Sequence, residues 1–330
     1  MVLILTDSDV VRVLNMNDGI DIIEQAFREH GNGKTILLPR ISHTLADSRG
    51  AFRIMAAGFP SLGWFGLKTL TGYPGRRHPG ETYISMLLFE IATGALRAVI
   101  AAKHLTGIRT GAATGVAAKY LARKDADVLG IFGIGAQARY QLEAVMAVRP
   151  LRLVKVLSRD HVETTAFADS ISKSFDVEVN VVASPREIVY GSSLIIAATT
   201  SRMPLFPGEW LEPGTHVSGI GANTPSKREL DSTCFVRSKV VVDFREQAIE
   251  EAGDLREAIS AGAIKTSDIY AELSEIVTGT KQGRCNNDEL TMFKSVGIAI
   301  EDVAAAAFVY EEATKRGVGT SLELEQFQQR

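Results

Sequence analysis

Cysteine, clustered histidine and long apolar runs are what this sequence has least of. Its 330 residues include two cysteines, Cys234 and Cys285, which form neither a CxxC pair nor a disulfide framework. The six histidines lack the spacing of paired metal ligands, so we expect no metal centre. No uncharged run approaches the roughly 20 residues that cross a bilayer, and the apolar start at Met1 reaches Asp7 too early for a signal-peptide core. We therefore expect a cytoplasmic protein.

The sequence also lacks a large excess of positive or negative charge. The 36 basic and 39 acidic residues leave a net charge of -3, which gives no long-range field toward nucleic acid or an anionic membrane. We expect neither partner. Hydrophobic residues make up 45% of the chain, enough for a large core, and the length suggests two domains.

Two patterns of predicted secondary structure divide the chain. In the first part, short apolar runs separated by glycine, proline and polar turns predict an antiparallel sheet, with strands at 51–58, 64–71, 83–90 and 96–101. From Asp127 onward strands alternate with helices, which predicts a doubly wound parallel sheet. Its strands are expected at 128–132, 153–157, 177–181, 194–198, 216–220 and 239–243. An amphipathic helix is predicted at 17–30, and an alanine-rich helix at 298–316 should return to pack on the first domain.

The strongest local signal is a glycine turn between a predicted strand and a predicted helix. It is a GxGxxA sequence that begins Gly133-Ile-Gly135 and ends at Ala138. Gly133 permits the tight turn, Gly135 lets the backbone approach a pyrophosphate, and Ala138 lets helix and strand pack closely. This context predicts a Rossmann-type domain that binds a dinucleotide.

The residues at the end of the next strand indicate whether the ribose of that dinucleotide carries a 2′-phosphate. An acidic residue there would hold the ribose hydroxyls of NAD, but the strand is followed by Ser158 and Arg159, whose hydroxyl and guanidinium suit a 2′-phosphate. The sequence therefore favours NADP(H) over NAD(H). The alternative is that Arg159 is a solvated residue and Asp160 binds the ribose.

Three cations stand alone in segments of apolar or small residues: Arg53, Lys68 and Arg109. A buried cation needs an anionic partner or costs several kcal/mol, and none of these segments carries a carboxylate nearby. A ligand could supply the negative charge, and so could an aspartate or glutamate distant in the sequence. Both interpretations remain open at this stage.

Several segments are distinctive when they occur together: 66–69 (GLKT), 105–113 (LTGIRTGAA), 133–138 (GIGAQA), 198–201 (ATTS), 220–230 (IGANTPSKREL) and 288–297 (DELTMFKSVG). With them the sequence resembles the ornithine cyclodeaminase and mu-crystallin family over nearly its whole length. That family also contains alanine dehydrogenases, ketimine and pyrroline-2-carboxylate reductases, and iminosuccinate reductases. The resemblance implies an α/β fold, with a dinucleotide-binding Rossmann domain at 119–299 and a discontinuous α+β domain for substrate binding and dimerisation at 1–118 and 300–330. It also implies a homodimer that shares a β-barrel.

The resemblance also implies roles for single residues. Arg53 and Lys68 match the substrate-carboxylate and catalytic positions, and Thr82 and Arg109 match positions at the nicotinamide and phosphate end of the site. The remaining implied cofactor contacts are Ala136 and Gln137 in the pyrophosphate turn, Thr199 beside a ribose, and Lys227 and Ser295 flanking the nicotinamide.

One departure from the family pattern bears on the reaction. Cyclodeaminases carry an aspartate, thought to accept a proton from the substrate amine, where this sequence has Asn223. An amide can hold an amine or imine by hydrogen bonding but is no base. We therefore expect an NAD(P)H-dependent oxidoreductase that reduces a small 2-imino acid to an L-amino acid, or catalyses the reverse reaction. Ornithine cyclodeaminase and a non-catalytic mu-crystallin-like binding protein are the alternatives.

In the expected reaction Arg53 would hold the substrate carboxylate and Lys68 would move a proton. A loop with Arg76, Arg77 and His78 could bind a second carboxylate or could be a solvated turn.

Overall fold

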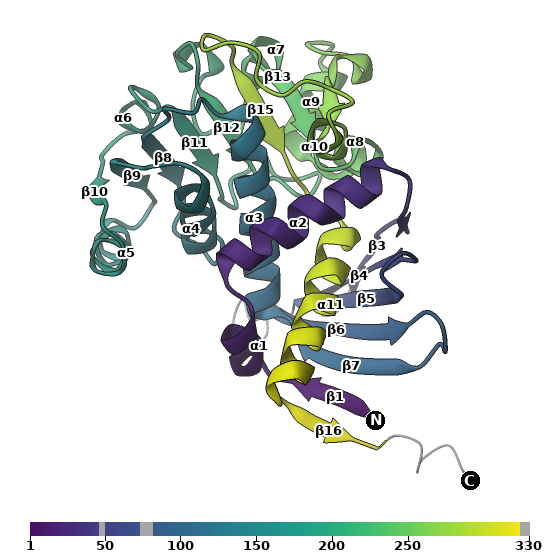
Figure 1. Cartoon of the computed structure of the whole chain (residues 1–330). Coiled ribbons are helices and arrows are strands. Elements are labelled where there is room, and N and C mark those ends of the chain that lie inside the picture. Colours follow the sequence, from purple (N-terminus) through teal and green to yellow (C-terminus); the bar gives the residue numbers. More distant parts are fainter. Residues whose placement is uncertain (46–49, 73–81, 324–330) are drawn as a thin grey trace. The chain divides into compact units, whose positions relative to one another are not determined.

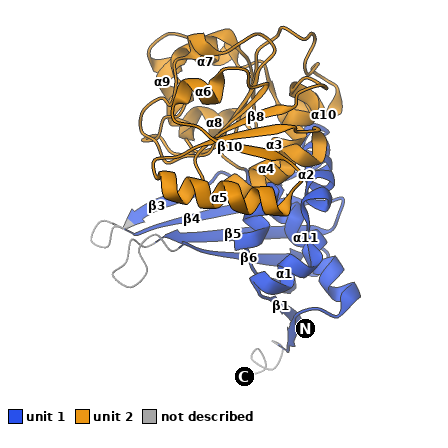
Figure 2. Ribbon diagram, turned by 90° about the vertical axis from the view of Figure 1, so that its left-hand side faces the viewer, with its two compact units in different colours: residues 1–109, 298–330 blue, residues 110–297 orange. Residues whose placement is uncertain are grey.

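The computed structural model describes residues 1–45, 50–72 and 82–323 of the chain. They form two compact units, one from residues 1–109 together with 298–330 and the other from residues 110–297 (Figure 2). Each unit is built on its own eight-stranded sheet. Among the described residues no helix is both long enough and apolar enough to span a membrane.

The sheet of the first unit has the strand order β16-β1-β7-β6-β5-β4-β2, and β3 also pairs with β4 (Figure 1). Its strands are β1 (Val2–Leu5), β2 (Ile36–Leu37), β3 (Ile41–Leu45), β4 (Gly50–Phe59), β5 (Trp64–Gly72), β6 (Thr82–Glu90), β7 (Leu96–Ala101) and β16 (Thr320–Leu322). The four strands predicted from the sequence are β4 to β7, and they pair antiparallel as expected. The sheet as a whole is mixed, because β1 pairs with β7 in parallel.

One face of this sheet is covered by helices. The unit contains α1 (Asp7–Val13), α2 (Met16–Gly31) and α11 (Ala299–Arg316). Helix α11 packs on β4, β5 and β6, and α2 packs on α11 (Figure 1). The approach is close at Gly66, where a Cβ atom would lie 2.8 Å from Met86 Cε and 3.2 Å from Val303 Cγ2. The predicted return of the last long helix onto the first domain is thus confirmed.

The sheet of the second unit is parallel throughout, in the order β10-β9-β8-β11-β12-β15-β13-β14. Its strands are β8 (Val128–Phe132), β9 (Leu153–Leu157), β10 (Glu178–Val181), β11 (Leu194–Ala197), β12 (His216–Gly219), β13 (Lys239–Val242), β14 (Ala271–Glu272) and β15 (Thr291–Lys294). All six predicted strands are present. The sequence did not predict β15, which inserts between β12 and β13.

Helices cover both faces of the parallel sheet. They are α4 (Ala138–Val148), α5 (His161–Ser174), α6 (Pro185–Val189), α7 (Ser232–Arg237), α8 (Arg245–Glu251), α9 (Gly253–Ser260) and α10 (Leu273–Thr278), with short 3₁₀ turns η1 (Gly208–Trp210) and η2 (Thr266–Asp268). Neighbouring residues of β11 enter different cores: Leu194 and Ile196 pack in the core that holds Leu142, while Ile195 packs in the core that holds Phe235. A strand buried on both faces is typical of a doubly wound sheet, so the predicted Rossmann-type fold is confirmed.

Two arginines satisfy the carboxyl end of α3 (Lys103–Leu121), the helix that crosses the division between the units. Arg149 donates to the carbonyl oxygens of Ala118, Lys119 and Ala122 at 2.8–3.1 Å, and Arg284 donates to that of Leu121 at 2.6 Å. The last carbonyls of a helix have no partner within it, and a cation also complements the helix dipole there. These arginines therefore serve the fold.

Candidate functional site

The glycine turn after β8 has a conformation that only glycine fits. Gly133 has a φ of +92°, and a Cβ atom there would lie 2.8 Å from the carbonyl oxygen of Ala198 and 3.0 Å from Thr199 Cγ2. At Gly135, by contrast, no atom lies within 4 Å of where a Cβ would be. Packing inside the protein therefore explains the first glycine but not the second. Gly135 leaves its backbone open to a ligand.

The helix that follows this turn begins without a side-chain cap. Gln137 occupies the N-cap position of α4 and its side chain makes no capping hydrogen bond, while the N–H of Ala138 donates to the carbonyl oxygen of Gly135 at 3.0 Å. The buried Gln137 Oε1 also has no hydrogen-bond partner among the described residues. Open backbone, uncapped N–H groups and the positive end of a helix dipole suit the pyrophosphate of a dinucleotide.

At the end of β9 the acidic residue is already engaged. Asp160 is the N-cap of α5, and its carboxylate accepts the backbone N–H of Glu163 at 3.0 Å. Arg159 is exposed, and Ser158 is half-buried. A hydroxyl and a guanidinium are thus the groups left at the strand tip.

The loops after β11 and β12 are tied together by one buried carboxylate. Glu229, with no exposed surface, accepts the backbone N–H groups of Thr199 at 2.5 Å, Gly221 at 2.7 Å and Ala222 at 3.0 Å. Burial raises the pKa of the Glu229 carboxyl. Beside it lies the fully buried ion pair of Lys294 and Asp254, 3.1 Å apart. None of these three was predicted as a site residue, although Glu229 and Lys294 lie in the distinctive segments 220–230 and 288–297.

These loops carry two of the predicted site residues. Lys227 Nζ donates to Asn223 Oδ1 at 3.2 Å and to the carbonyl oxygen of Gly221 at 3.3 Å. A lysine ammonium has only donors, so it fixes which end of the Asn223 amide faces it. The amide nitrogen of Asn223 is the end that remains for another partner.

Ser295 directly follows β15 and is also held at the carboxyl edge of the sheet. Its backbone N–H donates to the carbonyl oxygen of Gly219 at 3.1 Å, and its hydroxyl donates to Asp243 at 2.9 Å. The predicted residues Gly133, Thr199 and Ser295 thus follow β8, β11 and β15 at the same edge of one parallel sheet. Ligands of open α/β sheets bind at this edge.

In the other unit, two of the lone cations have carboxylate partners from a distant part of the sequence. Lys68 Nζ lies 2.7 Å from Asp302, Arg109 Nη1 lies 2.5 Å from Glu301, and Arg109 Nε lies 2.9 Å from Asp302. Both carboxylates are fully buried in the first turn of α11. For Lys68 and Arg109 the salt-bridge interpretation is therefore correct. Sequence reasoning missed Glu301 and Asp302, because acids in a first helical turn usually only complement the helix dipole.

Arg53 lies on the same face of the sheet as Lys68. Met55 is opposite Lys68 and Arg53 is opposite Leu70, so the two cations are diagonal neighbours on adjacent strands. Arg53 is half-buried and forms no ion pair within the described part of the chain. Thr82, opposite Gly72, faces the same side but is exposed. The structure thus brings Arg53 and Lys68 together and leaves Thr82 at the end of the strand.

Several cations lie close to one another beside this face of the sheet. Arg40, which contributes to lowering the pKa of Lys68, is a further cation near the three already named. Burial first, and then Arg109, lower the pKa of Lys68 to about 8, and this outweighs the opposite effect of Asp302. A lysine with such a pKa can both donate and accept a proton near neutral pH, and Arg53, without an ion pair among the described residues, suits a carboxylate ligand.

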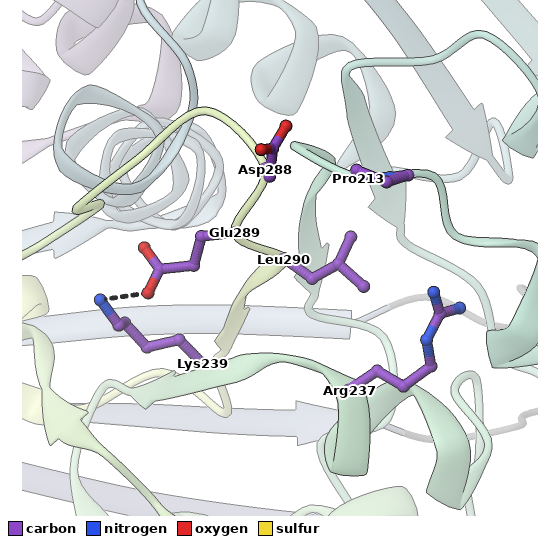
Figure 3. Close-up of a pocket in the computed structure, with 6 residues that line it drawn as sticks. All are labelled: Pro213, Arg237, Lys239, Asp288, Glu289 and Leu290. Atoms are coloured by element: carbon purple, nitrogen blue, oxygen red, sulfur yellow. Dashed lines mark ion pairs between the residues drawn. The ribbon is translucent and has the colours of Figure 1, made fainter.

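A separate cavity of about 490 Å³ lies at the opposite, amino-terminal edge of the parallel sheet. It is lined by Pro213, Arg237, Lys239, Asp288, Glu289 and Leu290. Lys239 and Glu289 form an ion pair with each other at 2.5 Å, so this charge is satisfied within the protein (Figure 3). No predicted site residue lines this cavity. The predicted loop of Arg76, Arg77 and His78 lies outside the described residues.

Comparison with known proteins decides the family. The model of the ornithine cyclodeaminase/mu-crystallin family matches residues 2–317. The chain belongs to this family. An alanine dehydrogenase from Archaeoglobus fulgidus is 37% identical over 322 residues, which cover 97% of this chain and 98% of the relative.

Solved structures agree. The Delta(1)-pyrroline-2-carboxylate reductase of Thermococcus litoralis, in complex with NADH and L-proline, superposes with a TM-score of 0.93 at 39% identity and covers 97% of this chain and 100% of that one. An archaeal alanine dehydrogenase dimer with bound NAD gives a TM-score of 0.92 at 35% identity, with 98% and 99% covered. The predicted family, fold and class are confirmed: the chain is a nicotinamide-dependent oxidoreductase of the group that acts on CH–NH or CH–NH2 bonds.

Proposed function

We propose that this protein reduces a small 2-imino acid to an L-amino acid, or oxidises the amino acid in the reverse direction. The observation that carries the proposal is the cationic face in which buried Lys68, with its lowered pKa, lies beside Arg53. Arg53 has no carboxylate partner of its own among the described residues and would bind the carboxylate of the substrate. The L-proline in the Thermococcus litoralis structure is an amino acid of this kind.

The dinucleotide, when bound, supplies or accepts the hydride at C4 of its nicotinamide. Gly133, Gly135, Ala136 and Gln137 would hold its pyrophosphate through the open turn and uncapped helix described above. The other proposed contacts are those of Thr199, Lys227 and Ser295 with the ribose and nicotinamide, and of Thr82 and Arg109 near the phosphate end.

The chain's own residues move the proton. Reduction of an imine adds one hydride to carbon and leaves one proton to be added at nitrogen, and the Lys68 ammonium is the donor we propose. Asp302 holds that ammonium in place at 2.7 Å. The Asn223 oxygen is occupied by Lys227, so its amide N–H2 would donate to the substrate.

This arrangement at Asn223 separates the proposal from its closest alternative. A cyclodeaminase has to deprotonate the ornithine amine before hydride can leave, and an amide that presents only N–H groups cannot accept that proton. We therefore propose reduction of a 2-imino acid rather than ornithine cyclisation. A non-catalytic binding role would give no reason for a buried lysine with a lowered pKa.

We further propose that NADPH is preferred to NADH. The single acid at the tip of β9, Asp160, is engaged as a helix cap, whereas Arg159 is exposed and Ser158 is half-buried. A guanidinium can pair with a 2′-phosphate in a bidentate manner. The two solved relatives described above contain NADH and NAD, so the preference concerns this chain's own residues.

We also propose a homodimer that forms, in the cytoplasm, through the face of the first sheet opposite the one on which α11 packs. On that face Ala56, Leu67, Leu87 and Val99 lie opposite one another in a row across four strands, and all are half-buried. Ile41 is 58% exposed on the same side. Apolar surface of this extent favours a protein partner, and one relative is described as a dimer.

A substrate screen tests the proposal. Oxidation of NADPH and of NADH would be followed with pyrroline-2-carboxylate, piperideine-2-carboxylate, iminosuccinate, and pyruvate with ammonia or methylamine, and ornithine with NAD would be the cyclodeaminase control. We expect turnover with at least one imino acid and none with ornithine. Background rates with every imino acid, despite cofactor binding, would favour the binding protein instead.

A further inference from the structure

The hydroxyl of Ser295 has its hydrogen committed to a buried carboxylate. Asp243, at the end of β13, has no exposed surface, and Ser295 is only 4% exposed. Ser295 Oγ donates to Asp243 Oδ2 at 2.9 Å. Because Ser295 is nearly buried, bulk water competes little for this bond.

The surroundings of Asp243 fix the direction of that hydrogen bond. Its Oδ2 also accepts the backbone N–H groups of Val296 at 2.7 Å and Gly297 at 2.6 Å, and its Oδ1 accepts the N–H of Phe244 at 2.9 Å. All of these neighbours are donors. An ionised carboxylate only accepts, so Ser295 has to be the donor in its bond to Asp243.

Ser295 Oγ can therefore only accept further hydrogen bonds. A hydroxyl oxygen has two lone pairs, and one of them receives the N–H of Gly297 at 3.2 Å. The turn that positions the oxygen is fixed on both sides, since Ser295 N–H donates to Gly219 and Gln247 Nε2 donates to the carbonyl oxygen of Gly297 at 2.9 Å. One lone pair at a fixed place is left for a ligand that donates.

We propose that Asp243 is a positioning residue that makes Ser295 a hydrogen-bond acceptor for the amide N–H2 of the nicotinamide. The inference rests on the proposed function, in which Ser295 flanks that ring. Of the two polar groups of the carboxamide, Ser295 then binds the amide N–H2 and not the carbonyl oxygen. This sets the rotation of the carboxamide, and with it the placement of the ring that gives up hydride.

The test compares two cofactors that differ at this one group. In 3-acetylpyridine adenine dinucleotide phosphate a methyl replaces the amide N–H2 of NADP⁺, so the donor is lost while the carbonyl is kept. Dissociation constants for both would be measured by calorimetry on the full-length protein, and the same pair without the 2′-phosphate would be measured alongside. We expect Ser295→Ala to weaken NADP⁺ binding about three- to tenfold, the worth of one neutral hydrogen bond, and to leave binding of the acetyl analogue unchanged.

Two variants of Asp243 test whether it sets the direction of the Ser295 hydrogen bond or only supports the fold. In Asp243→Asn the amide oxygen can still accept from Ser295, Val296 and Gly297, so the preference for NADP⁺ over the analogue should persist. In Asp243→Ala the Ser295 hydroxyl is released and can rotate to donate to the carbonyl that both cofactors share, so the preference should shrink by a similar factor. A purely structural role would weaken both cofactors equally and leave their ratio unmoved.

The possible results separate a failure of this inference from a failure of the proposed function. Equal losses for both cofactors in Ser295→Ala, no loss for either, or a larger loss for the acetyl analogue would overturn the inference while leaving the reductase intact. A wild-type protein that bound neither NADP⁺ nor NAD⁺ would overturn the proposed function and the inference together. If Asp243→Ala fails to fold, Ser295→Ala still tests whether Ser295 accepts from the amide, and a loss of the preference for NADP⁺ in Asp243→Asn would overturn the role of Asp243.

Discussion

Lys68 lies 2.7 Å from Asp302, a carboxylate 234 residues later in the chain that has no exposed surface and that also contacts Arg109 at 2.9 Å. One carboxylate is therefore shared by two cations. Burial lowers the pKa of Lys68 most, Arg109 beside the shared carboxylate lowers it further, and Asp302 offsets only part of these two effects.

We expect Lys68→Ala and Arg53→Ala to lose most of the reductase activity while dinucleotide binding stays near normal. A lost charged hydrogen bond to the substrate should cost about 2–4 kcal/mol of transition-state binding, or roughly 30- to 800-fold in kcat/KM. Lys173→Ala, an exposed lysine of α5, serves as the matched control. Near-normal kcat/KM in either variant would remove that residue from the site.

The pH profile should report Lys68 directly. If its ammonium donates the proton, kcat/KM for imine reduction will fall above about pH 8, the pKa that burial gives Lys68. Asp302 raises this pKa, so Asp302→Asn should move the break to lower pH. Glu250→Gln, an exposed carboxylate changed in the same way, should leave it in place. An identical break in wild type and Asp302→Asn would mean that another group titrates.

Acid stability should depend on one buried histidine. Burial lowers the pKa of His216 to about 3, and the ring contacts Thr291 at 2.9 Å and Ser218 at 3.2 Å. Between about pH 6.5 and pH 3 the unfolded chain binds a proton here that the folded chain does not, so the free energy of unfolding should fall on acidification, by at most about 1.4 kcal/mol per pH unit.

His216→Asn removes that titration, so its Tm should change less than that of the wild type between pH 7.5 and pH 5. The exposed His161, changed in the same way, is the control. An unchanged pH dependence of Tm in His216→Asn would show that its protonation is not linked to unfolding.

Cofactor preference should depend on Arg159. Arg159→Ala is expected to raise the KM for NADPH about tenfold, as a partly solvated charged hydrogen bond would, with little change for NADH. Arg152→Ala, another exposed arginine on the same segment, should alter neither. If Arg159→Ala shifts both cofactors alike, or neither, the residue lies away from the 2′ position.

The parallel sheet could be predicted because its strands carry their own signal. The five residues of β8 are all buried, and so are the four of β11, and such short apolar runs between helical segments are characteristic of strands covered on both faces. β15 was missed because its four residues include Thr291 and Lys294, which are polar in sequence. They are buried because Lys294 pairs with Asp254, 40 residues earlier.

The same limit applies to the candidate site. A lone cation in an apolar segment showed that a partner was needed, but the partners Glu301 and Asp302 are 192 and 234 residues away from Arg109 and Lys68. They can be found only when α11 is known to cross β5. The three backbone hydrogen bonds that Glu229 accepts likewise depend on two loops that meet only in the folded sheet.

Asn223 gives the sharpest test of the reaction, because it separates reduction from cyclisation. Its oxygen accepts from Lys227 at 3.2 Å, so Asn223→Asp would place a carboxylate beside that ammonium and withdraw the N–H2 proposed to hold the imine. We expect kcat/KM for imine reduction to fall at least about tenfold, because one hydrogen bond is lost and a negative charge is added beside the substrate carboxylate. Asn223→Ala, which removes the amide without adding charge, is the matched comparison and should lose less.

Proline and ammonia formation from ornithine would be measured in the same preparations. The wild type should form neither, because no base faces the amine at Asn223. Adding Lys227→Met to Asn223→Asp frees the new carboxylate from its ion pair, and any amine oxidation should rise in that double variant relative to the single one. Robust proline formation by the unmodified protein would overturn the assignment, since another group would then have to act as the base. Lys68, which can accept a proton near neutral pH, is the residue we would then expect to do so.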